Sequence, residues 1–470
     1  MESRQAAKVT TSIKSLGAVI LGAALFIGGC AKKQMASFQS LKNPELAAQL
    51  KSFVAEKEAQ AKAAKMPSGF QAFFAVAAKG DWPAASNAFI ELRQQAAPYQ
   101  RSGETNERSR GIAWEAVVET WGTLEAFGEG DEKYALVFGT NIVASIPAGS
   151  IYFGGTPAGH FIIAALQKSH VRAEPFFTLT QGGLPDAGYL DYLRGMYGAK
   201  IYTPTEEDWK KVYQNYTQDA TERRSRNQLK PGEEVTVGAD GKIQVSGPTA
   251  RIEVKALLAK IIFDKNPDRE FYFEESIPLD WMYPYLEPHG MVFKINRQPL
   301  PELSGEIVKQ DHDYWRTLVR PMIGDWLADD TSVEQVAAFA KKTFGKHDFN
   351  GFMGDRRFVQ NAYSQKMFSK LRSSLAGHYA ARLQHATGAA EKKRMAREAD
   401  FAFRQAWALC PDYTEVVLRY VALLMEQKRV ADALMVADTA AQMPSMQGQE
   451  GQLMRNLVVT LKESRKGTGP

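Results

Sequence analysis

The stretch SIYFGGTPAGHFIIAALQK, residues 150–168, decides the fold class of this chain of 470 residues. It opens with a short apolar run, breaks at a pair of glycines and continues with the apolar pattern of a helix. Similar short runs recur at FFTL (176–179), AKIY (199–202), EFYF (270–273) and MVFKI (291–295), and helical stretches separate most of them. Strands separated by helices of this length predict an α/β domain with a parallel or mixed sheet.

Helical patterns flank this alternating region on both sides. Before it, LAAQLKSFVAEKEAQAKAAK has few large apolar groups, which is typical of an exposed spacer helix. A helical hairpin that turns at Gly80 follows, and then a helix whose Trp114 and Trp121 we expect in the core. We predict five segments: a signal peptide at 1–29, a helical spacer at 30–66, a helical hairpin region at 67–131, the α/β domain at 132–300 and a helical domain at 301–470.

Two stretches in the last segment repeat the same spacing of small and apolar residues, at intervals of four, three and three. They are Ala399, Phe403, Ala406 and Leu409 before Pro411, and Ala433, Ala437, Ala440 and Met443 before Pro444. The region of about 375–447 therefore resembles tetratricopeptide repeats, although Val417 and Lys428 replace the usual tryptophan and turn glycine. The resemblance implies stacked helical hairpins that offer a surface to a protein or peptide partner.

The first 34 residues combine a basic start, an apolar run from Leu16 to Gly29 and the sequence IGGC, which ends at Cys30. This order is typical of a secretory signal. Ile-Gly-Gly before a cysteine is similar to the lipobox of bacterial lipoproteins, which implies cleavage before Cys30 and lipidation of its thiol. The resemblance implies a lipid anchor in the bacterial envelope facing the periplasm, with the outer membrane favoured over the inner by Ala31. An uncleaved N-terminal membrane helix is the alternative.

Composition argues against several classes of protein. The formal charge is +5, and it falls to +3 without the first 29 residues, so the charge does not indicate nucleic-acid binding. Besides Cys30, the only cysteine is Cys410, in the apolar stretch AWALC. We expect it to be buried, with no disulfide framework and no cysteine zinc site. The sequence contains no HExxH, GxSxG or EF-hand motif, and we expect no metal and no cofactor.

The loops after the predicted strands are the places to look for a ligand site, because ligands bind beyond the carboxyl ends of strands in open α/β sheets. Two glycines and a helix-capping threonine follow the first strand, so free N–H groups at the start of the next helix would face an anion. We expect Asp186, after the second strand, to cap its helix. The predicted ligand-binding residues are Gly154, Gly155, Thr156, His160 and Asp186, with a plain tight turn as the alternative.

Other polar clusters give weaker grounds for chemistry. The stretches FEESIPLDW and YPYLEPHG contain carboxylates that could act as general acids or bases if buried, but two adjacent carboxylates on a strand point to opposite faces. In DHDYW (311–315), consecutive helical residues do not share a face and cannot chelate one ion together. An enzyme would be favoured by convergence in one pocket of His160, Asp186, Glu274, Glu287 and His289.

The central segment resembles the soluble extracytoplasmic part of bacterial O-mannosyltransferase-like membrane proteins. The phrases that carry the resemblance are IPAGSIYFGGTPAGHFIIAALQ, FFTLTQGGLPDAGYLDYLRGMYG and YLEPHGMVFKINRQP, and it covers about residues 145–300. It implies an α/β accessory domain beside tetratricopeptide-like helices. It does not imply transferase activity, because GGTPAGH replaces the family's acidic loop and the family's multi-helix membrane domain has no counterpart.

The favoured expectation is a lipid-anchored, extracytoplasmic binding or scaffolding protein of the bacterial envelope. Its protein or peptide partner would bind to the C-terminal repeats. The alternative is an enzyme, or a degenerate enzyme, that acts on a glycan or an anionic substrate through the α/β domain. No catalytic residue is predicted.

Overall fold

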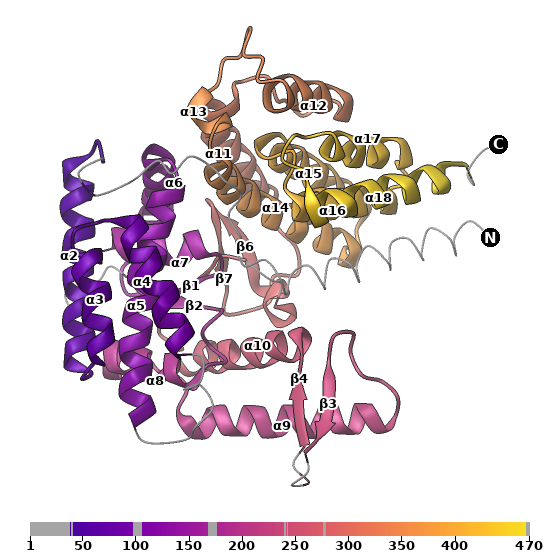
Figure 1. Cartoon of the computed structure of the whole chain (residues 1–470). Helices are drawn as coiled ribbons and strands as arrows, with labels where there is room; N and C mark the ends of the chain where they lie inside the picture. Colours follow the sequence, from indigo (N-terminus) through magenta and orange to yellow (C-terminus); the bar gives the residue numbers. More distant parts are fainter. Residues whose placement is uncertain are drawn as a thin grey trace. The chain divides into compact units, whose positions relative to one another are not determined.

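The computed structural model describes residues 38, 41–96, 106–167, 176–238, 241, 243–275 and 279–466. The described chain is mostly helical and divides into two compact units (Figure 1). Of the described residues, the sheet unit comprises those up to Tyr285 and Phe293–Arg297, and the helical unit comprises Leu286–Val292 and those from Gln298 onward. Helices combined with a small mixed sheet confirm the predicted fold class at this level. Among the described residues, no helix is both long enough and apolar enough to span a membrane.

Most of the sheet unit is helical, with short strands between the helices. Its helices are α2 (Pro44–Ala63), α3 (Ser68–Ala77), α4 (Trp82–Ala96), α5 (Asn106–Glu129), α6 (Glu132–Ser145), α7 (Pro157–Leu166), α8 (Ala187–Tyr197), α9 (Glu206–Ser225) and α10 (Pro248–Lys265). Short 3₁₀ helices are η3 (Gly198–Lys200) and η4 (Asp280–Tyr285). Its strands are β1 (Ile151–Gly154), β2 (Phe177–Thr180), β3 (Glu234–Val237), β4 (Ile243–Ser246), β5 (Phe271–Phe273) and most of β7 (Val292–Ile295), and the remaining strand, β6 (Leu286–His289), belongs to the helical unit.

Five of these strands form one mixed sheet in the order β2-β1-β5-β7-β6. β1 is parallel to both of its neighbours, and Ile151 lies opposite Phe177 and Phe271. β7 runs antiparallel to β5. All four residues of β1 are buried, as expected for a central strand covered on both faces. Four predicted strand stretches are confirmed, whereas β6, in the stretch YPYLEPHG, is not among the predicted strands.

The strand predicted at AKIY (199–202) is wrong. Gly198 ends α8 with a φ of 55°, and the chain continues through η3 into an extended segment that is not part of either described sheet. Tyr202 bonds instead to a side chain: its N–H donates to Asn266 Oδ1 at 2.7 Å, and its carbonyl accepts from Asn266 Nδ2 at 3.0 Å. One amide side chain therefore satisfies the backbone groups that a neighbouring strand would otherwise pair.

The spacer predicted at 30–66 is also wrong where the chain is described. α2 packs against α5 and buries four large apolar side chains at positions i, i+4, i+7 and i+8, namely Leu46, Leu50, Phe53 and Val54. This is the stripe of a helix that faces a core. α2 to α6 thus belong to the same compact unit as the sheet. The predicted signal peptide and Cys30 lie outside the described residues.

Several local predictions are confirmed. Gly80 has a φ of 69°, and a side chain there would collide with the ring of Phe38. Thr205 and Asp208 form a capping box at the start of α9. β3 and β4 form the predicted hairpin as a separate two-stranded sheet, with a φ of 77° at Gly241. These turns and caps are specified by residues that are close in sequence, so they can be predicted without knowledge of the tertiary fold.

Two expectations about side-chain burial have different outcomes. Trp114 and Trp121 are only half-buried, and both stack on Phe89, with ring centroids 5.6 and 4.2 Å away. Cys410 is buried with a free thiol, and burial raises the pKa of that thiol. The cysteine is therefore a small core residue, as predicted.

The helical unit consists of helices, and α14 packs on α15, α16 on α17, and α17 on α18 (Figure 1). Its elements are α11 (Gly305–Ile323), α12 (Val333–Ala340), the π-helix η5 (Lys341–Gly345), α13 (Arg356–Val359), α14 (Ala362–His385), α15 (Ala389–Leu409), α16 (Thr414–Glu426), α17 (Val430–Ala441) and α18 (Gly448–Lys466). The small residues of the predicted repeats have no exposed surface: Ala399, Ala406, Ala433, Ala437 and Ala440. They allow neighbouring helices to approach closely.

Because Ala440 is fully buried on α17, we expect Ala440→Phe to destabilise the helical unit by about 1–3 kcal/mol through overpacking. Ala431→Phe, at an exposed position of the same helix, is the matched control. Urea unfolding of the full chain, followed by circular dichroism, measures both effects. Equal unfolding midpoints for the two variants would contradict the close packing at α17.

Candidate functional site

The two loops predicted to bind a ligand lie at the same edge of the sheet. β1 and β2 are parallel neighbours, so the loops that follow them both leave the sheet at the carboxyl ends of the strands. Thr156 Oγ1 accepts a hydrogen bond from the Gly159 N–H at 3.0 Å and caps α7. Asp186 Oδ1 accepts from the Gly188 N–H at 2.7 Å and caps α8. Both capping predictions are confirmed.

The N–H groups at the start of α7 do face an anion, and this anion is a side chain of the same chain. Glu274, directly after β5, accepts at Oε2 from the N–H groups of Gly155 at 2.8 Å and Thr156 at 3.1 Å. The Thr156 hydroxyl donates to Oε1 at 2.5 Å, and the Tyr152 hydroxyl donates to Oε2 at 3.2 Å. An internal carboxylate therefore occupies the position that the sequence analysis assigned to an external anion.

Glu274 has no exposed surface, and protein groups close the edge around it. Burial raises the pKa of the Glu274 carboxyl, while the hydrogen bonds it accepts act in the opposite direction. Gln181 Nε2 donates to the carbonyl of Glu274 at 2.5 Å and to that of Phe153 at 3.2 Å. A side chain at Gly159 would collide with the Glu274 carboxylate. This glycine is required by close approach rather than by an unusual backbone angle.

His160 lies in the first turn of α7 but contacts α5. Its Nε2 lies 3.3 Å from Oε1 of Glu119. Oε2 of Glu119 accepts from the Tyr192 hydroxyl at 2.8 Å and is ion-paired with Lys57. Lys57 in turn donates to the Tyr192 hydroxyl at 2.8 Å. These four buried residues, one each from α2, α5, α7 and α8, form the buried ion cluster.

A second carboxyl group lies one turn earlier on α5. Burial raises the pKa of Glu115 to about 8, and the negative charges of Asp186 and Glu119 act in the same direction. Two of the predicted residues, His160 and Asp186, thus interact with carboxyl groups on the same helix. The acid that would have to join them in a catalytic site, Glu274, is bonded to the start of α7 instead.

The other predicted polar residues take separate roles. Glu287 and His289 lie on β6, in the helical unit. In DHDYW, Asp311 is buried and accepts from Arg372 at 2.8 Å, His312 lies between two carboxylates, and Asp313 faces solvent. Among the described residues, no group of three or more His, Cys, Asp or Glu side chains is placed to hold a metal ion.

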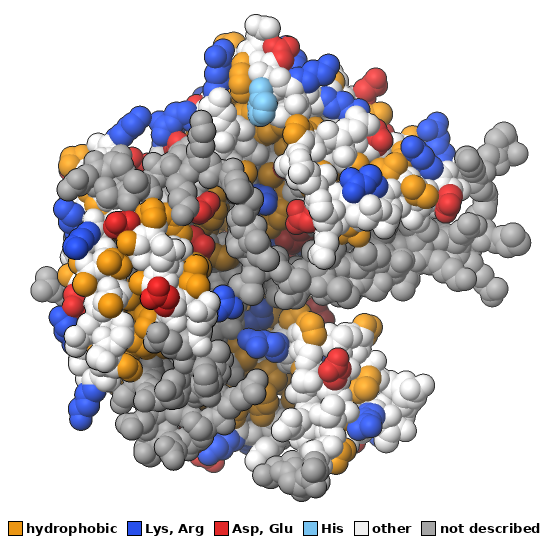
Figure 2. Space-filling model, viewed as in Figure 1, with side chains coloured by type: hydrophobic (Ala, Val, Ile, Leu, Met, Phe, Trp, Pro, Cys, Tyr) orange, Lys and Arg blue, Asp and Glu red, His pale blue; other side chains and the backbone are white. Residues whose placement is uncertain are grey.

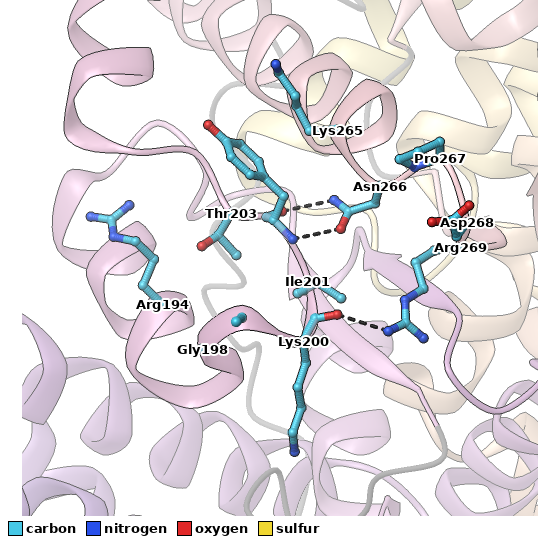
Figure 3. Close-up of a pocket in the computed structure, with 12 residues that line it drawn as sticks. Arg194, Gly198, Lys200, Ile201, Thr203, Lys265, Asn266, Pro267, Asp268 and Arg269 are labelled. Atoms are coloured by element: carbon cyan, nitrogen blue, oxygen red, sulfur yellow. Dashed lines mark hydrogen bonds between the residues drawn. The ribbon is translucent and has the colours of Figure 1, made fainter.

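An open pocket of about 910 Å³ lies in the sheet unit at the amino ends of the strands, opposite to the predicted edge (Figure 3). The end of α8 with η3 forms one side, and the end of α10 with the segment before β5 forms the other. Its charged lining residues are Arg194, Lys200, Lys265, Asp268 and Arg269. The lining does not include Gly154, Gly155, Thr156, His160 or Asp186.

Neither a scan against models of known protein families nor searches of curated proteins and of solved structures found a match to this chain. Figure 2 shows basic and acidic side chains interspersed over the coloured part of the visible face. That part of the surface lacks the continuous basic stripe that is typical of nucleic-acid binding.

The sequence analysis did not single out Lys57, Glu119 or Tyr192. One signal was present for Lys57, because it follows Phe53 by four residues and precedes Ala61 by four, on the buried stripe of α2. A lysine at such a position needs a buried partner. The partner itself lies on α5, and only the tertiary packing identifies it.

We expect Lys57→Met to destabilise the sheet unit by about 3 kcal/mol, the lower end of the cost of breaking a buried ion pair. The lower end applies because Glu119 keeps its contacts with His160 and Tyr192. Lys62→Met, which removes a lysine that is 60% exposed on the same helix, is the matched control. Urea unfolding measures both variants, and a K57M variant as stable as K62M would contradict a structural role for the buried ion cluster.

Glu115 gives a prediction for pH dependence. Its pKa is about 8 in the fold and 4.5 as an ordinary glutamate, so between these values the folded chain holds a proton that the unfolded chain releases. Rising pH therefore favours unfolding over this interval, and Glu115→Gln should remove that loss of stability. The free energy of unfolding, measured at pH 5 and pH 8, should fall less in E115Q than in wild type. Glu91→Gln, at an exposed position of α4, should follow wild type. Parallel behaviour of E115Q and wild type would contradict the raised pKa.

Proposed function

We propose that this protein is a binding or scaffolding protein of the bacterial envelope. In this proposal it is anchored by lipid at Cys30, faces the periplasm at the outer membrane, and takes a protein or peptide partner on its helical unit. The leader that ends in IGGC supports the anchor. The repeat spacing and the complete burial of its small residues support tetratricopeptide-like hairpins as the binding part.

The observation that carries the binding proposal is one highly exposed methionine in the loop between η5 and α13 of the helical unit. Met353 in this loop is 84% exposed. In Figure 1 the loop projects away from the neighbouring helices of its unit. An exposed methionine adapts to many apolar surfaces, because its side chain is unbranched and polarisable.

Aromatic side chains fix the base of this loop. The rings of Phe349 and Phe352 lie 5.7 Å apart, and Phe352 lies 6.1 Å from Phe339 on α12. The ring centroids of Phe339 and Trp326 lie 4.3 Å apart. Met353 thus projects from an ordered aromatic base, which reduces the entropy that binding would cost. The preceding turn is a π-helix, an element that is frequent at functional sites.

The loop is close to the predicted repeats. A side chain at Gly345, the last residue of η5, would contact Met443 at the end of α17, and α12 also packs on α17. The start of the loop therefore lies beside the end of α17.

An enzyme that acts on a glycan or an anionic substrate remains the alternative function. It would need an acid or base open to a ligand in the α/β region. Glu274, the acid nearest to the predicted loop, is fully buried and accepts four hydrogen bonds from protein groups. Binding is therefore favoured over catalysis.

The test is photocrosslinking in cells that express the full chain. A photocrosslinking amino acid in place of Met353 should trap a discrete envelope partner, whereas the same amino acid in place of Lys392, exposed on α15, should not. In a second arm, Cys30→Ser should abolish palmitate labelling and leave a longer precursor. The crosslink at 353 should then weaken, because the chain no longer reaches its membrane.

Each arm has a result that contradicts it. Identical crosslinks from positions 353 and 392 would remove the exposed loop as a binding element. Unchanged palmitate labelling of C30S would remove the lipid anchor. Because the two arms use separate readouts, one part of the proposal can fail without the other.

A further inference from the structure

The open pocket at the amino ends of the strands has a strongly basic lining. Arg194, Lys200, Lys265 and Arg269 line it together with a single carboxylate, Asp268. Figure 3 shows the basic side chains spread around the pocket rather than meeting at one point. The charge is therefore distributed over the mouth of the pocket.

The protein offsets this positive charge only in part. Lys265 interacts electrostatically with the carboxylate of Asp208. Arg194 is ion-paired with Asp191. In the part of the chain that the structure describes, Lys200, Lys265 and Arg269 have no carboxylate within ion-pair distance. Two acidic residues near them in sequence are paired elsewhere, Asp264 with Lys260 and Glu270 with Lys294. Asp268 interacts with the guanidinium of Arg297.

The pocket is built on fixed groups. Arg269 donates to the carbonyls of Gly149 at 3.3 Å and Lys200 at 3.0 Å, and its guanidinium lies 5.4 Å from the centre of the Phe177 ring. Carbonyls orient a guanidinium without cancelling its charge. Asn266, buried at the floor, holds the backbone of Tyr202 through two hydrogen bonds. Arg269 and the backbone beside it are thus oriented before any ligand arrives, whereas Lys200 and Lys265 carry their charges on exposed side chains.

Helix ends explain only part of the basic charge. The pocket lies at the carboxyl-terminal ends of α8 and α10, where Arg194 and Lys265 offset the partial negative charge of the helix dipoles. Lys200 and Arg269 lie outside both helices and are not needed for this purpose. Together with the weak neutralisation by carboxylates, they give the pocket an excess of positive charge that an anionic ligand can use.

We propose that this pocket binds an extended ligand that carries two or more phosphate groups. Because the cations are spread around the pocket (Figure 3), a ligand with more than one anionic group matches them better than a single small anion does, and a volume of about 910 Å³ accommodates such a ligand. Lysine and arginine are the usual partners of phosphate in proteins. Two sources share this chemistry, a soluble phosphorylated compound and a row of phospholipid headgroups. The site lies in the sheet unit and goes beyond the partner binding proposed for the helical unit.

The experiment compares the full chain with a double variant, Lys200→Gln with Lys265→Gln. Isothermal titration calorimetry with inorganic tripolyphosphate tests the soluble source. Co-sedimentation with phosphatidylglycerol vesicles, against phosphatidylcholine vesicles, tests the headgroup source. The matched control is Lys392→Gln with Lys393→Gln, which removes the same charge from exposed positions of α15. Asp268→Asn removes the single acid of the lining and provides a variant with the opposite expected effect.

The expected result is that wild type binds at least one probe, that K200Q/K265Q binds it at least fivefold more weakly, and that K392Q/K393Q changes affinity less than twofold. D268N should bind more tightly than wild type, and rising salt should weaken binding. Tripolyphosphate binding without vesicle binding assigns a soluble ligand, and selective sedimentation with phosphatidylglycerol vesicles assigns lipid headgroups. The proposal is overturned if wild type binds neither probe, or if both double variants weaken binding equally. It is also overturned if D268N fails to strengthen binding.

Discussion

The sheet unit depends on one interaction, the bond between the buried carboxylate of Glu274 and the start of α7. A helix that begins at a sheet edge has unpaired N–H groups, and burial makes them costly unless an acceptor reaches them. Glu274 supplies that acceptor from the end of β5, the strand beside β1. The interaction therefore joins two strands and a helix at a single point. It also explains why the edge where a ligand was expected is closed.

The buried ion cluster applies the same physical solution between helices. Lys57 and Glu119 would each be costly alone in the core, and together they connect α2 with α5 and α8. The ionisable groups at the start of α7 and in the buried ion cluster thus point into the core, where they hold helices and strands together. Outside these two sites, the sheet unit has the basic pocket and the helical unit has the exposed Met353, which are the places proposed for binding.

The parts of the fold that could be predicted are those specified by neighbouring residues. Apolar runs such as SIYF gave the strands, and capping residues such as Asp186 gave the helix starts. Predictions failed where a distant side chain decides the outcome. The segment around Tyr202 looks like a strand but pairs with Asn266, 64 residues away. Likewise, the sequence located the anion position at Gly155, but nothing local shows that residue 274 fills it.

The contact between Gly159 and Glu274 has a consequence for how this chain can change in evolution. Any side chain at position 159 would collide with the Glu274 carboxylate. Gly159 can therefore be replaced only in a chain where a smaller residue already stands at position 274. Loss of the glutamate alone would in turn leave the N–H groups of α7 without their acceptor. The two positions, 115 residues apart in the sequence, are therefore bound to vary as a pair. Homologous chains that keep the acid should keep the glycine, and those that lose both should open this edge of the sheet.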